Sequence, residues 1–583
     1  MSDKSNKKSN ALEKAMGRIR DKIFNKKKTV KSKPDFAHFM TWIARYKKSS
    51  FAQRHPTATT DLVCLSMMIA VWAGVNNYDK VSDTFVTMKE WMFGADKKDA
   101  QSVKHTYGAY LNQIRPITPL LIANVLTYEG LVTDENGMHV VYDDSNSKAL
   151  APGQKAAGTP TICIGCTKDP YDRQITSYTA PVTPEDAYVF SVSHIERKET
   201  YFYMYCYAMA GIRPQNTNQA LALASVIYNT GANLFEKTPD AGERFANLRK
   251  LYAKYGNELP DSVVQAEFAA RPIKDMEKFG DALRRGKINK AADLLGLYTW
   301  GKVKVNGKWT MKDLRGLWVR RFVEAGILLG KVEPMHLMNV PVKHLAEFLE
   351  IMGGKKRAFF TGSGDNIKLN HATFADLNKW LQNPVDRYGK PIKGKILIRE
   401  ALAPDVIAFC DAGKCVLGGK EVFEVETQLV HNLRMYEHAL RCCANEDYAA
   451  AEISYNQILQ TDKNNALIYN DLAFVCIKME RYDDALNYCK KVISGCKGAS
   501  PKELGAAYYN AGIAAERKNQ PARALENYRL AIAKGNDADA VKECVRRLEK
   551  RLNLNTGKAK VKNAVRAKNM RTQRAAKNKK SAR

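Results

Sequence analysis

Apolar residues recur at helical spacing along most of the chain, and short β-type runs interrupt them at few places. Helical patterns fill 35–116, 120–126 and 218–229. Two β-rich runs, 138–142 and 161–164, are separated by an insertion rich in Gly, Pro and Ala, which is typical of a surface loop. The sequence therefore predicts a mainly α, multidomain protein that contains one α+β lobe with a small β-hairpin sheet.

A repeat with a period of 34 residues occupies the C-terminal part. Ala451 and Tyr455 precede Ala485 and Cys489 by one period, and a third copy follows after five additional residues. Small residues also recur in the preceding helices, at Ala439, Ala473 and Gly512. This pattern resembles tetratricopeptide repeats, which implies an α-solenoid with a capping helix near 540–552 and a protein partner that the sequence does not identify.

The segment 331–425 is the least informative. Runs at 395–398 and 406–409 indicate strands or short buried segments, and GSGD at 362–365 lacks the Gly-Lys-Ser/Thr of a phosphate loop. The expected organisation is a basic disordered arm at 1–34, a helical N-terminal region at 35–117, an α+β lobe at 118–330, a linker or small mixed domain at 331–428, a repeat domain at 429–552 and a basic disordered tail at 553–583.

Positive charge is concentrated at the two ends. The net charge is +31, and residues 1–33 carry 12 Lys or Arg against 3 acids, while 552–583 carry 11 and no acid. Such arms suit polyanions, either nucleic acid or an acidic wall polymer, and the alternative is a solubilising tail.

Cysteine usage and the N-terminus indicate where the protein is made. The 12 cysteines are scattered without a disulfide framework, so we expect synthesis in a reducing bacterial or host cytoplasm. The N-terminus MSDKSNKKSN is polar, which predicts no signal peptide, and the apolar run 62–74 is too short for a transmembrane segment.

A glutamate at the end of the helix at 120–126 faces the predicted hairpin, which carries an aspartate and a threonine. One carboxyl group that keeps its proton and one that stays ionised are what glycosidic bond cleavage requires. Glu129 and one of the adjacent residues Asp143 and Asp144 therefore form a candidate catalytic pair.

Three blocks resemble the phage-type lysozymes, glycoside hydrolase family 24, over about 118–330. The first block contains Glu129-Gly130-Leu131, Tyr142-Asp143-Asp144 and Thr161-Ile162-Cys163-Ile164-Gly165-Cys166; the second runs from Gln219 through Ser225, Tyr228 and Asn229 to Gly231; the third runs from Gly316 through Arg320 and Arg321 to Glu324. The three blocks occur in the order found in the family.

The resemblance implies a lysozyme that cleaves the β-1,4 bond between N-acetylmuramic acid and N-acetylglucosamine in peptidoglycan at the cell wall, free or on a virion. It implies Glu129 as the general acid, Asp144 on the attacking water and Thr161 holding that water, with no cofactor. A separation of ~6.5–9.5 Å between the two carboxyl groups is expected for inversion. Asp143 is the alternative to Asp144, and Thr161 could simply be a β-branched strand residue.

Asn229 and Arg320 are candidate substrate-binding residues, and the alternative for both is a role in helix packing.

The chain departs from the family at Cys163 and Cys166, where the family has glycine and histidine. Together with Cys410 and Cys415 these thiols could form a zinc site, although two small buried residues are the simpler interpretation. The departures keep two further hypotheses open, a structural or cargo protein with a decayed site and a lytic transglycosylase.

Overall fold

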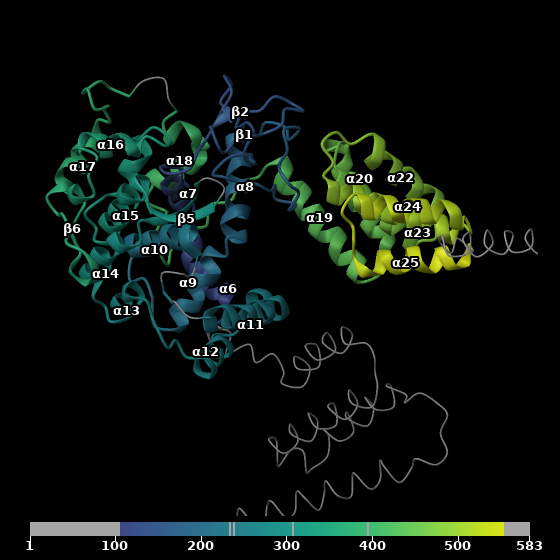
Figure 1. Cartoon of the computed structure of the whole chain (residues 1–583), viewed down its shortest axis with the longest axis horizontal. Coiled ribbons are helices and arrows are strands. Elements are labelled where there is room, and N and C mark those ends of the chain that lie inside the picture. The colour runs from purple at the N-terminus through teal and green to yellow at the C-terminus, as the bar shows by residue number, and fades with distance from the viewer. Residues whose placement is uncertain (1–104, 232–234, 237–238, 306–307, 393–395, 553–583) are drawn as a thin grey trace, which may run out of the picture. The chain divides into compact units, whose positions relative to one another are not determined.

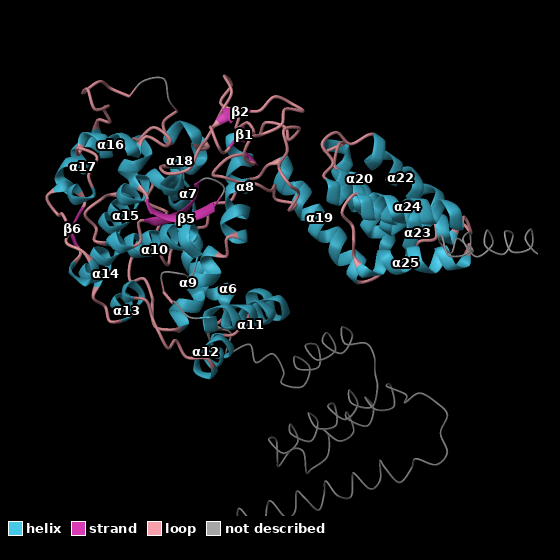
Figure 2. Ribbon diagram, viewed as in Figure 1, coloured by secondary structure: helices cyan, strands magenta, loops and turns pink. Residues whose placement is uncertain are grey.

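The computed structural model describes residues 105–231, 235–236, 239–305, 308–392 and 396–552 (Figure 1). Helices make up most of this part, and small antiparallel sheets accompany them (Figure 2). The arm expected at 1–34, most of the helical region expected at 35–117 and the tail expected at 553–583 lie outside the described residues. Within the described ranges, no helix is both long enough and apolar enough to cross a membrane.

The helix predicted at 120–126 is confirmed as α7 (Thr118–Leu126), which is buried along its whole length. It follows α6 (Tyr107–Ile114) and the short 3-10 helix η1 (Arg115–Ile117). Pro119 stands at the start of α7, where a missing backbone N–H costs nothing. Because α7 is apolar on every side, it forms the centre of the lobe.

The hairpin sheet has shorter strands than the sequence predicts. Its strands are β1 (Tyr142–Asp143), β2 (Lys148–Ala149) and β3 (Pro160–Thr161), in the antiparallel order β2-β1-β3. Tyr142 pairs with both Ala149 and Thr161. The pairing stops early because the Asp143 carboxylate accepts backbone N–H groups of the insertion, and because the chain turns tightly between Ile162 and Cys166.

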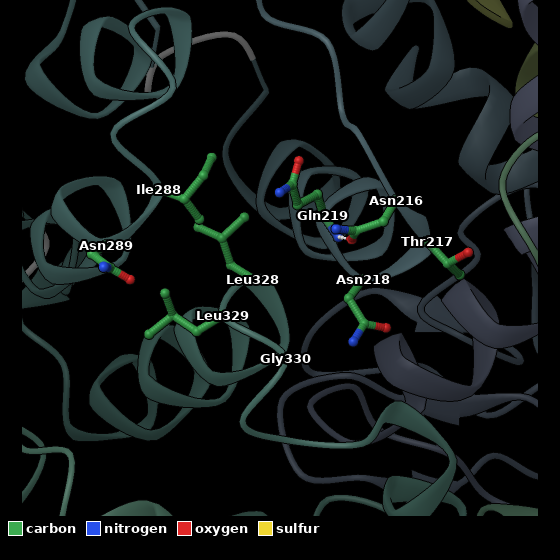
Figure 3. A pocket seen from close by; sticks show the side chains of 9 residues that line it. All are labelled: Asn216, Thr217, Asn218, Gln219, Ile288, Asn289, Leu328, Leu329 and Gly330. Carbon is green, nitrogen blue, oxygen red and sulfur yellow. Dashed lines mark hydrogen bonds between the residues drawn. The ribbon is translucent and has the colours of Figure 1, made fainter.

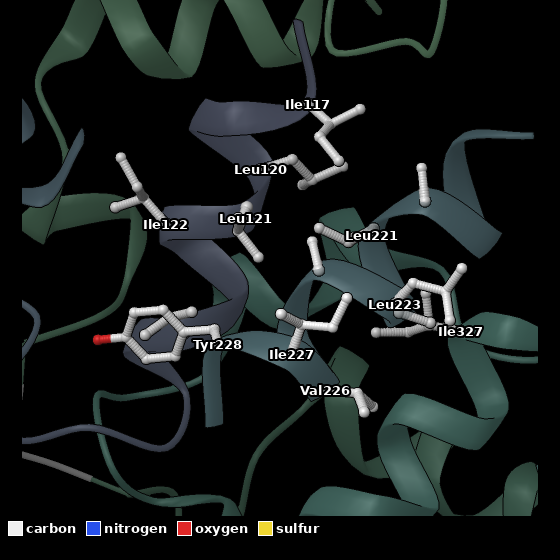
Figure 4. Packing of buried hydrophobic residues seen from close by; sticks show 14 of the residues in the cluster. Ile117, Leu120, Leu121, Ile122, Leu221, Leu223, Val226, Ile227, Tyr228 and Ile327 are labelled. Carbon is white, nitrogen blue, oxygen red and sulfur yellow. The ribbon is translucent and has the colours of Figure 1, made fainter. Parts of the chain in front are cut away.

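Three helices pack around one another in the core of the lobe (Figure 4). They are α7, α10 (Thr217–Thr230) and α15 (Arg315–Leu328), and Figure 4 shows Leu121 of α7 close to Ile227 of α10. Asn216 caps α10 by accepting the N–H of Gln219. Ahead of α10 lie α8 (Pro184–Arg197), which Thr183 caps, and α9 (Thr200–Met209).

The insertion between the second and third sequence blocks is mostly helical and ends in a long hairpin. Its elements are α11 (Pro239–Tyr255), η3 (Gly256–Glu258), α12 (Asp261–Ala270), α13 (Lys278–Arg284), α14 (Ile288–Leu294), η4 (Leu295–Leu297), β4 (Trp300–Val305) and β5 (Lys308–Asp313). The two strands pair antiparallel along their whole length.

Residues after 330 share the hydrophobic core of the lobe. Phe348, Phe359 and Phe374 all belong to the cluster that contains α7 and α10, so the expected boundary between 330 and 331 is not a break in this core. The elements are η5 (Pro334–Asn339), α16 (Leu345–Ile351), η6 (Lys356–Ala358), β6 (Phe360–Thr361), η7 (Gly364–Asn366), β7 (Lys368–Leu369), α17 (Thr373–Gln382), η8 (Arg399–Ala401) and α18 (Pro404–Asp411).

One short segment in this region, predicted as a strand or a short buried segment, is helical. Residues 406–409 lie inside α18, because Pro404 suits the first turn of a helix. At 395–398, the described part forms a single bridge from Leu397 to Pro341.

The predicted repeats form paired helices. They are α19 (Gln428–Ala444), α20 (Tyr448–Thr461), α21 (Ala466–Lys478), α22 (Tyr482–Ser494), α23 (Pro501–Arg517) and α24 (Pro521–Ala533), followed by α25 (Asp539–Arg551) at the position expected for a capping helix. All the predicted small residues of the second helices, Ala451, Ala485 and Ala524, are buried. A Cβ atom on Gly512 would lie 2.5 Å from the Tyr528 ring, so the third pair needs a glycine there.

Candidate active site

Glu129 lies just beyond the end of α7. Its backbone N–H donates to the carbonyl oxygen of Val125 at 3.1 Å, so the helix still fixes its position. The side chain is 31% exposed, and Oε1 accepts a hydrogen bond from Nη1 of Arg320 at 3.3 Å. A Cβ atom on Gly165 would lie 3.9 Å from Oε2. The carboxylate is therefore held on one oxygen, while the other faces a residue that has no side chain.

Arg320 is a buried guanidinium between two carboxylates. It is 4% exposed, and its Nε donates to Oε1 of Glu324 at 3.2 Å. Its guanidinium carbon lies 4.4 Å from the centroid of the Tyr128 ring, a cation–π contact. Burial alone would lower the pKa of Arg320, but the negative charges of Glu324 and Glu129 outweigh it and raise that pKa. Arg320 therefore stays charged and orients Glu129.

The network continues inward from Glu324. This carboxylate is fully buried and accepts hydrogen bonds from the Ser225 hydroxyl at 2.7 Å and from Arg321. Arg321 also donates to Oδ1 of Asn229, and its Nε donates to the carbonyl oxygen of Tyr298 at 3.1 Å. Breaking a buried charged pair by removing one partner costs about 3–5 kcal/mol, so this network ties α10 and α15 to the site.

Of the two candidate substrate-binding residues, only Asn229 is exposed. Its Oδ1 is occupied by Arg321, so its amide NH₂ group is the part that a ligand could use. Arg320 is buried against Glu129 and acts through that carboxylate.

Asp143 and Asp144 have different environments. Asp143 is buried and accepts hydrogen bonds from Ser145, from Ala157 N at 2.7 Å and from Gly158 N at 3.0 Å. The hydrogen bond from the Ser145 hydroxyl and the backbone N–H groups outweigh burial and lower the pKa of Asp143 to about 2. This carboxylate holds the loop of the insertion in place.

Asp144 is exposed, and only its Oδ1 has a hydrogen-bond partner among the described residues, Thr159 N at 2.7 Å. It is therefore the carboxylate of the pair that can reach a ligand. The resemblance implies Asp144 as the catalytic aspartate, with Asp143 as the alternative, and of the two only Asp144 is exposed.

Tyr142 is buried in β1, directly before the two adjacent aspartates. Burial raises the pKa of its phenol, and the negative charges of Glu129 and Asp144 both add to that effect. Its hydroxyl donates to the carbonyl oxygen of Gly130 at 2.7 Å. Glu129 and Asp144 thus lie near the same phenol, which was not among the predicted site residues.

Thr161 is buried in β3, and its hydroxyl donates to the carbonyl oxygen of Thr159 at 2.9 Å. With its proton engaged, the hydroxyl can only accept a hydrogen bond from a bound molecule. Past Thr161, Cys163 has φ +53°, the left-handed region that favours glycine. The turn thus holds a cysteine in a backbone conformation that favours glycine.

The four cysteines considered as a zinc site form two separate pairs. Cys163 hydrogen-bonds with Cys166 in the hairpin turn, and the sulfur atoms of Cys410 and Cys415 are 2.9 Å apart near the end of α18. In the described part of the chain, no three metal-ligating side chains gather into one site. Burial raises the pKa of Cys163, as expected for an inert buried thiol.

A separate cavity of about 480 Å³ opens at the other end of α10 (Figure 3). Amide side chains, including those of Asn218 and Asn289, line it together with Leu328 and Leu329. Because Asn229 lies near the C-terminal end of α10 and Asn218 near its N-terminal end, the cavity is distinct from the surroundings of Glu129.

Sequence reasoning missed three residues of the site: Tyr128, Tyr142 as a neighbour of both carboxylates, and Glu324 as the anchor of both arginines. Glu324 follows Arg320 by four residues and Arg321 by three, and these helical spacings were the available indication that it contacts both arginines.

Comparison with known proteins concerns the C-terminal part. Residues 464–534 match the family model described as Tetratricopeptide repeat. Stress-induced-phosphoprotein 1 of Caenorhabditis elegans is 25% identical over 109 residues, which is 18% of this chain and 34% of that protein. The chain thus spans about a third of the length of this curated relative.

Two solved structures resemble the same part. The Arabidopsis OM64 TPR domain has 19% identity and covers 21% of this chain and 98% of its own, with a TM-score of 0.20. The N-terminal domain of stress-induced protein-1 from C. elegans has 18% identity and covers 21% and 99%, also with a TM-score of 0.20. The family match over residues 464–534 and the paired helices there show that this part of the predicted repeats consists of tetratricopeptide repeats.

Proposed function

We propose that the lobe around Glu129 is a peptidoglycan hydrolase of the lysozyme type, which cleaves the β-1,4 bond between N-acetylmuramic acid and N-acetylglucosamine. The observation that carries the proposal is the position of Glu129. Buried Arg320 holds Oε1, and Oε2 faces Gly165 in the turn that follows Thr161. A general acid needs one fixed oxygen and one oxygen within reach of the substrate.

The proposed reaction is a single displacement. Glu129 gives its proton to the glycosidic oxygen while the bond from that oxygen to the anomeric carbon breaks. A water molecule attacks the anomeric carbon from the opposite face, and Asp144 takes the proton that the water loses. Exposed Asp144 suits this role, because Asp143 is already saturated by the loop.

Thr161 contributes as an acceptor in this scheme. Its hydroxyl proton is directed at Thr159, so its oxygen can receive a hydrogen bond from the attacking water and fix that molecule's orientation. The exposed amide group of Asn229 is the proposed hydrogen-bond donor to a sugar ring.

The tetratricopeptide repeats give the hydrolase a second activity in this proposal. Repeats of this kind present an extended concave surface, and we propose that they bind a protein that brings the lobe to the cell wall. The basic ends then act on nucleic acid or on acidic wall polymers.

The test is the mass of the fragments released from purified peptidoglycan. The wild-type chain is expected to release reducing muropeptides that have gained one water per bond, with inverted configuration at the new anomeric carbon. Glu129→Gln is expected to release none, whereas Glu135→Gln, which changes an exposed loop glutamate, is expected to behave as wild type. Anhydro products that are one water lighter would instead assign a lytic transglycosylase.

A second candidate is an assembly protein in which the lobe no longer catalyses. Two observations favour it. The cysteines at 163 and 166 are buried, and the hydroxyl of Thr161 already donates to Thr159, so none of these side chains is freely accessible to a substrate. It predicts that a folded wild-type protein releases no fragments but still captures a protein partner through the repeats.

A further inference from the structure

The hairpin formed by β4 and β5 exposes aromatic side chains on one face. Its register pairs Trp300 with Asp313, Lys302 with Met311 and residue 304 with Trp309. Residues paired directly across two antiparallel strands point to the same side, as do alternate residues of one strand. Trp300, Trp309 and Met311 therefore share one face of the hairpin; β5 is labelled in Figure 2.

This face is open. Trp300, Trp309 and Met311 are 54%, 69% and 54% exposed, which are high values for such large apolar side chains. Neither indole stacks on another ring among the described residues. Exposed apolar groups gathered on one face mark a site of interaction, whereas apolar residues scattered singly do not.

The base of the hairpin is joined to the candidate active site. Asp313, the last residue of β5, accepts a hydrogen bond from Nε1 of Trp318 at 2.8 Å. Tyr298, two residues before β4, accepts one from Nε of Arg321 at 3.1 Å. Trp318 and Arg321 belong to the same helix as Arg320, the partner of Glu129. A ligand on the hairpin is thus close in the fold to the elements that position the catalytic carboxylate.

We propose that the aromatic face of this hairpin binds the glycan strand of peptidoglycan alongside the site at Glu129, an inference that rests on the proposed function. An indole ring offers a flat apolar surface to the C–H groups of a sugar ring, as well as a polar N–H. Trp309 is paired with residue 304, which is four positions after Trp300 in β4. The two tryptophans are therefore about 13 Å apart along the strands, a span of a few linked sugars.

The charge of the hairpin suits the same ligand. Lys302, Lys308 and Lys312 are all exposed, and the peptide stems of peptidoglycan carry carboxylates. Lys302 lies on the aromatic face, between the two tryptophans along the strands. Stacking on the sugars and pairing with stem carboxylates together select a strand that carries both groups.

The experiment measures binding of the full-length chain to insoluble purified peptidoglycan in the Glu129→Gln background, so that cleavage plays no part. High salt, about 0.5 M, screens the basic ends and leaves stacking contacts largely unaffected. The test variant is Trp300→Ala with Trp309→Ala. The matched control is Tyr388→Ala, which removes an aromatic ring that is equally exposed, at 69%, outside the hairpin.

We expect the double variant to bind at least about tenfold more weakly than the control, with an unchanged melting temperature, because both exposed indoles of the face are removed. Equal binding by the double variant and the control would overturn the inference. So would a loss of binding to phosphatidylglycerol vesicles or to single-stranded DNA without any loss on peptidoglycan.

The result is separable from the proposed function. Weakened binding in a protein whose wild-type form releases no fragments would keep the inference and remove the hydrolase. Fragment release by the wild type, together with tryptophan-independent binding, would keep the hydrolase and remove the inference.

Discussion

At the scale of single residues, the two adjacent aspartates of the hairpin are distinguished by what they bind. Asp143 accepts the N–H groups of Ala157 and Gly158, and Asp144 stays exposed with one oxygen bound to Thr159. Asp143 thus anchors the loop of the insertion, whereas Asp144 is the candidate catalytic group.

Two matched substitutions test this division. Asp144→Asn is expected to abolish fragment release and leave the melting temperature unchanged. Asp143→Asn is expected to lower the melting temperature, because an amide NH₂ group cannot accept the loop N–H groups that the carboxylate satisfies. Thermal unfolding and fragment release, measured on both variants, test these two expectations. The reverse pattern, with Asp143→Asn stable but inactive, would transfer the catalytic role to Asp143.

The repeats contain a buried carboxylate that makes their stability depend on pH. Asp471 in α21 accepts a hydrogen bond from the Tyr436 hydroxyl, and its Oδ2 has no partner among the described residues. Burial raises the pKa of Asp471 to about 7, while the bond from Tyr436 opposes that shift.

The folded repeats therefore retain a proton at Asp471 that the unfolded chain loses near pH 4. The contribution of Asp471 to their free energy of unfolding is expected to be highest below about pH 4, to fall as the pH rises from about 4 to about 7, and to level off above. Asp471→Asn should remove this dependence and stabilise the repeats at pH 8. Amide hydrogen exchange in α21 measures the pH dependence of this stability. The control is Asp483→Asn, which changes a side chain that is 78% exposed.

At the scale of elements, close approach of paired helices explains why the repeat period was readable in the sequence. Gly512 in α23 lies against the Tyr528 ring of α24, and Ala473 and Ala439 are fully buried at the equivalent positions. Small residues recur every repeat because each helix pair meets in the same way.

Gly512→Ala is expected to destabilise the repeats by about 1–3 kcal/mol, because its methyl group overlaps the Tyr528 ring. In a Tyr528→Leu background the ring is gone, and the same change should become neutral or stabilising, since alanine favours a helix over glycine by about 1 kcal/mol. Denaturant unfolding of the four variants completes a double-mutant cycle. A destabilisation of equal size in both backgrounds would show that the ring is not the cause.

The elements that sequence patterns predicted well are those whose partners are local. α7 follows from an apolar run with Pro119 at its start, and α10 follows from an apolar run capped by Asn216. α8 begins after Thr183, whose hydroxyl accepts the N–H of Asp186. The hairpin strands were predicted too long, because side-chain contacts of Asp143 replace backbone pairing there. The exposed tryptophans of β4 and β5 had no predicted role, since periodicity does not distinguish a core aromatic from an exposed one.

At the scale of the whole molecule, the lobe and the repeats have separate hydrophobic clusters. The lobe cluster runs from α6 to residues beyond 400, whereas Tyr455 and Tyr528 belong to clusters formed within the repeats. The inclusion of 331–428 in the lobe was not predictable, because its apolar residues are widely spaced and find their partners in α7 and α15 only after folding.

The candidate site also assembles across long sequence distances. Glu129 and Arg320 are 191 residues apart, and Ser225 and Glu324 are 99 apart. The residue types of the site could be chosen from the sequence blocks, but the buried network that orders them depends on the packing of α10 against α15. The candidate site therefore centres on one carboxylate, Glu129, held by one buried arginine, Arg320.

The most direct test is the loss of turbidity of a purified peptidoglycan suspension on addition of the full-length chain, compared among wild type, Glu129→Gln and Glu135→Gln. We predict clearing by wild type and Glu135→Gln, and none by Glu129→Gln, with all three folded to the same melting temperature. A folded wild-type protein that leaves the suspension turbid, or clearing by Glu129→Gln at the wild-type rate, would contradict the account.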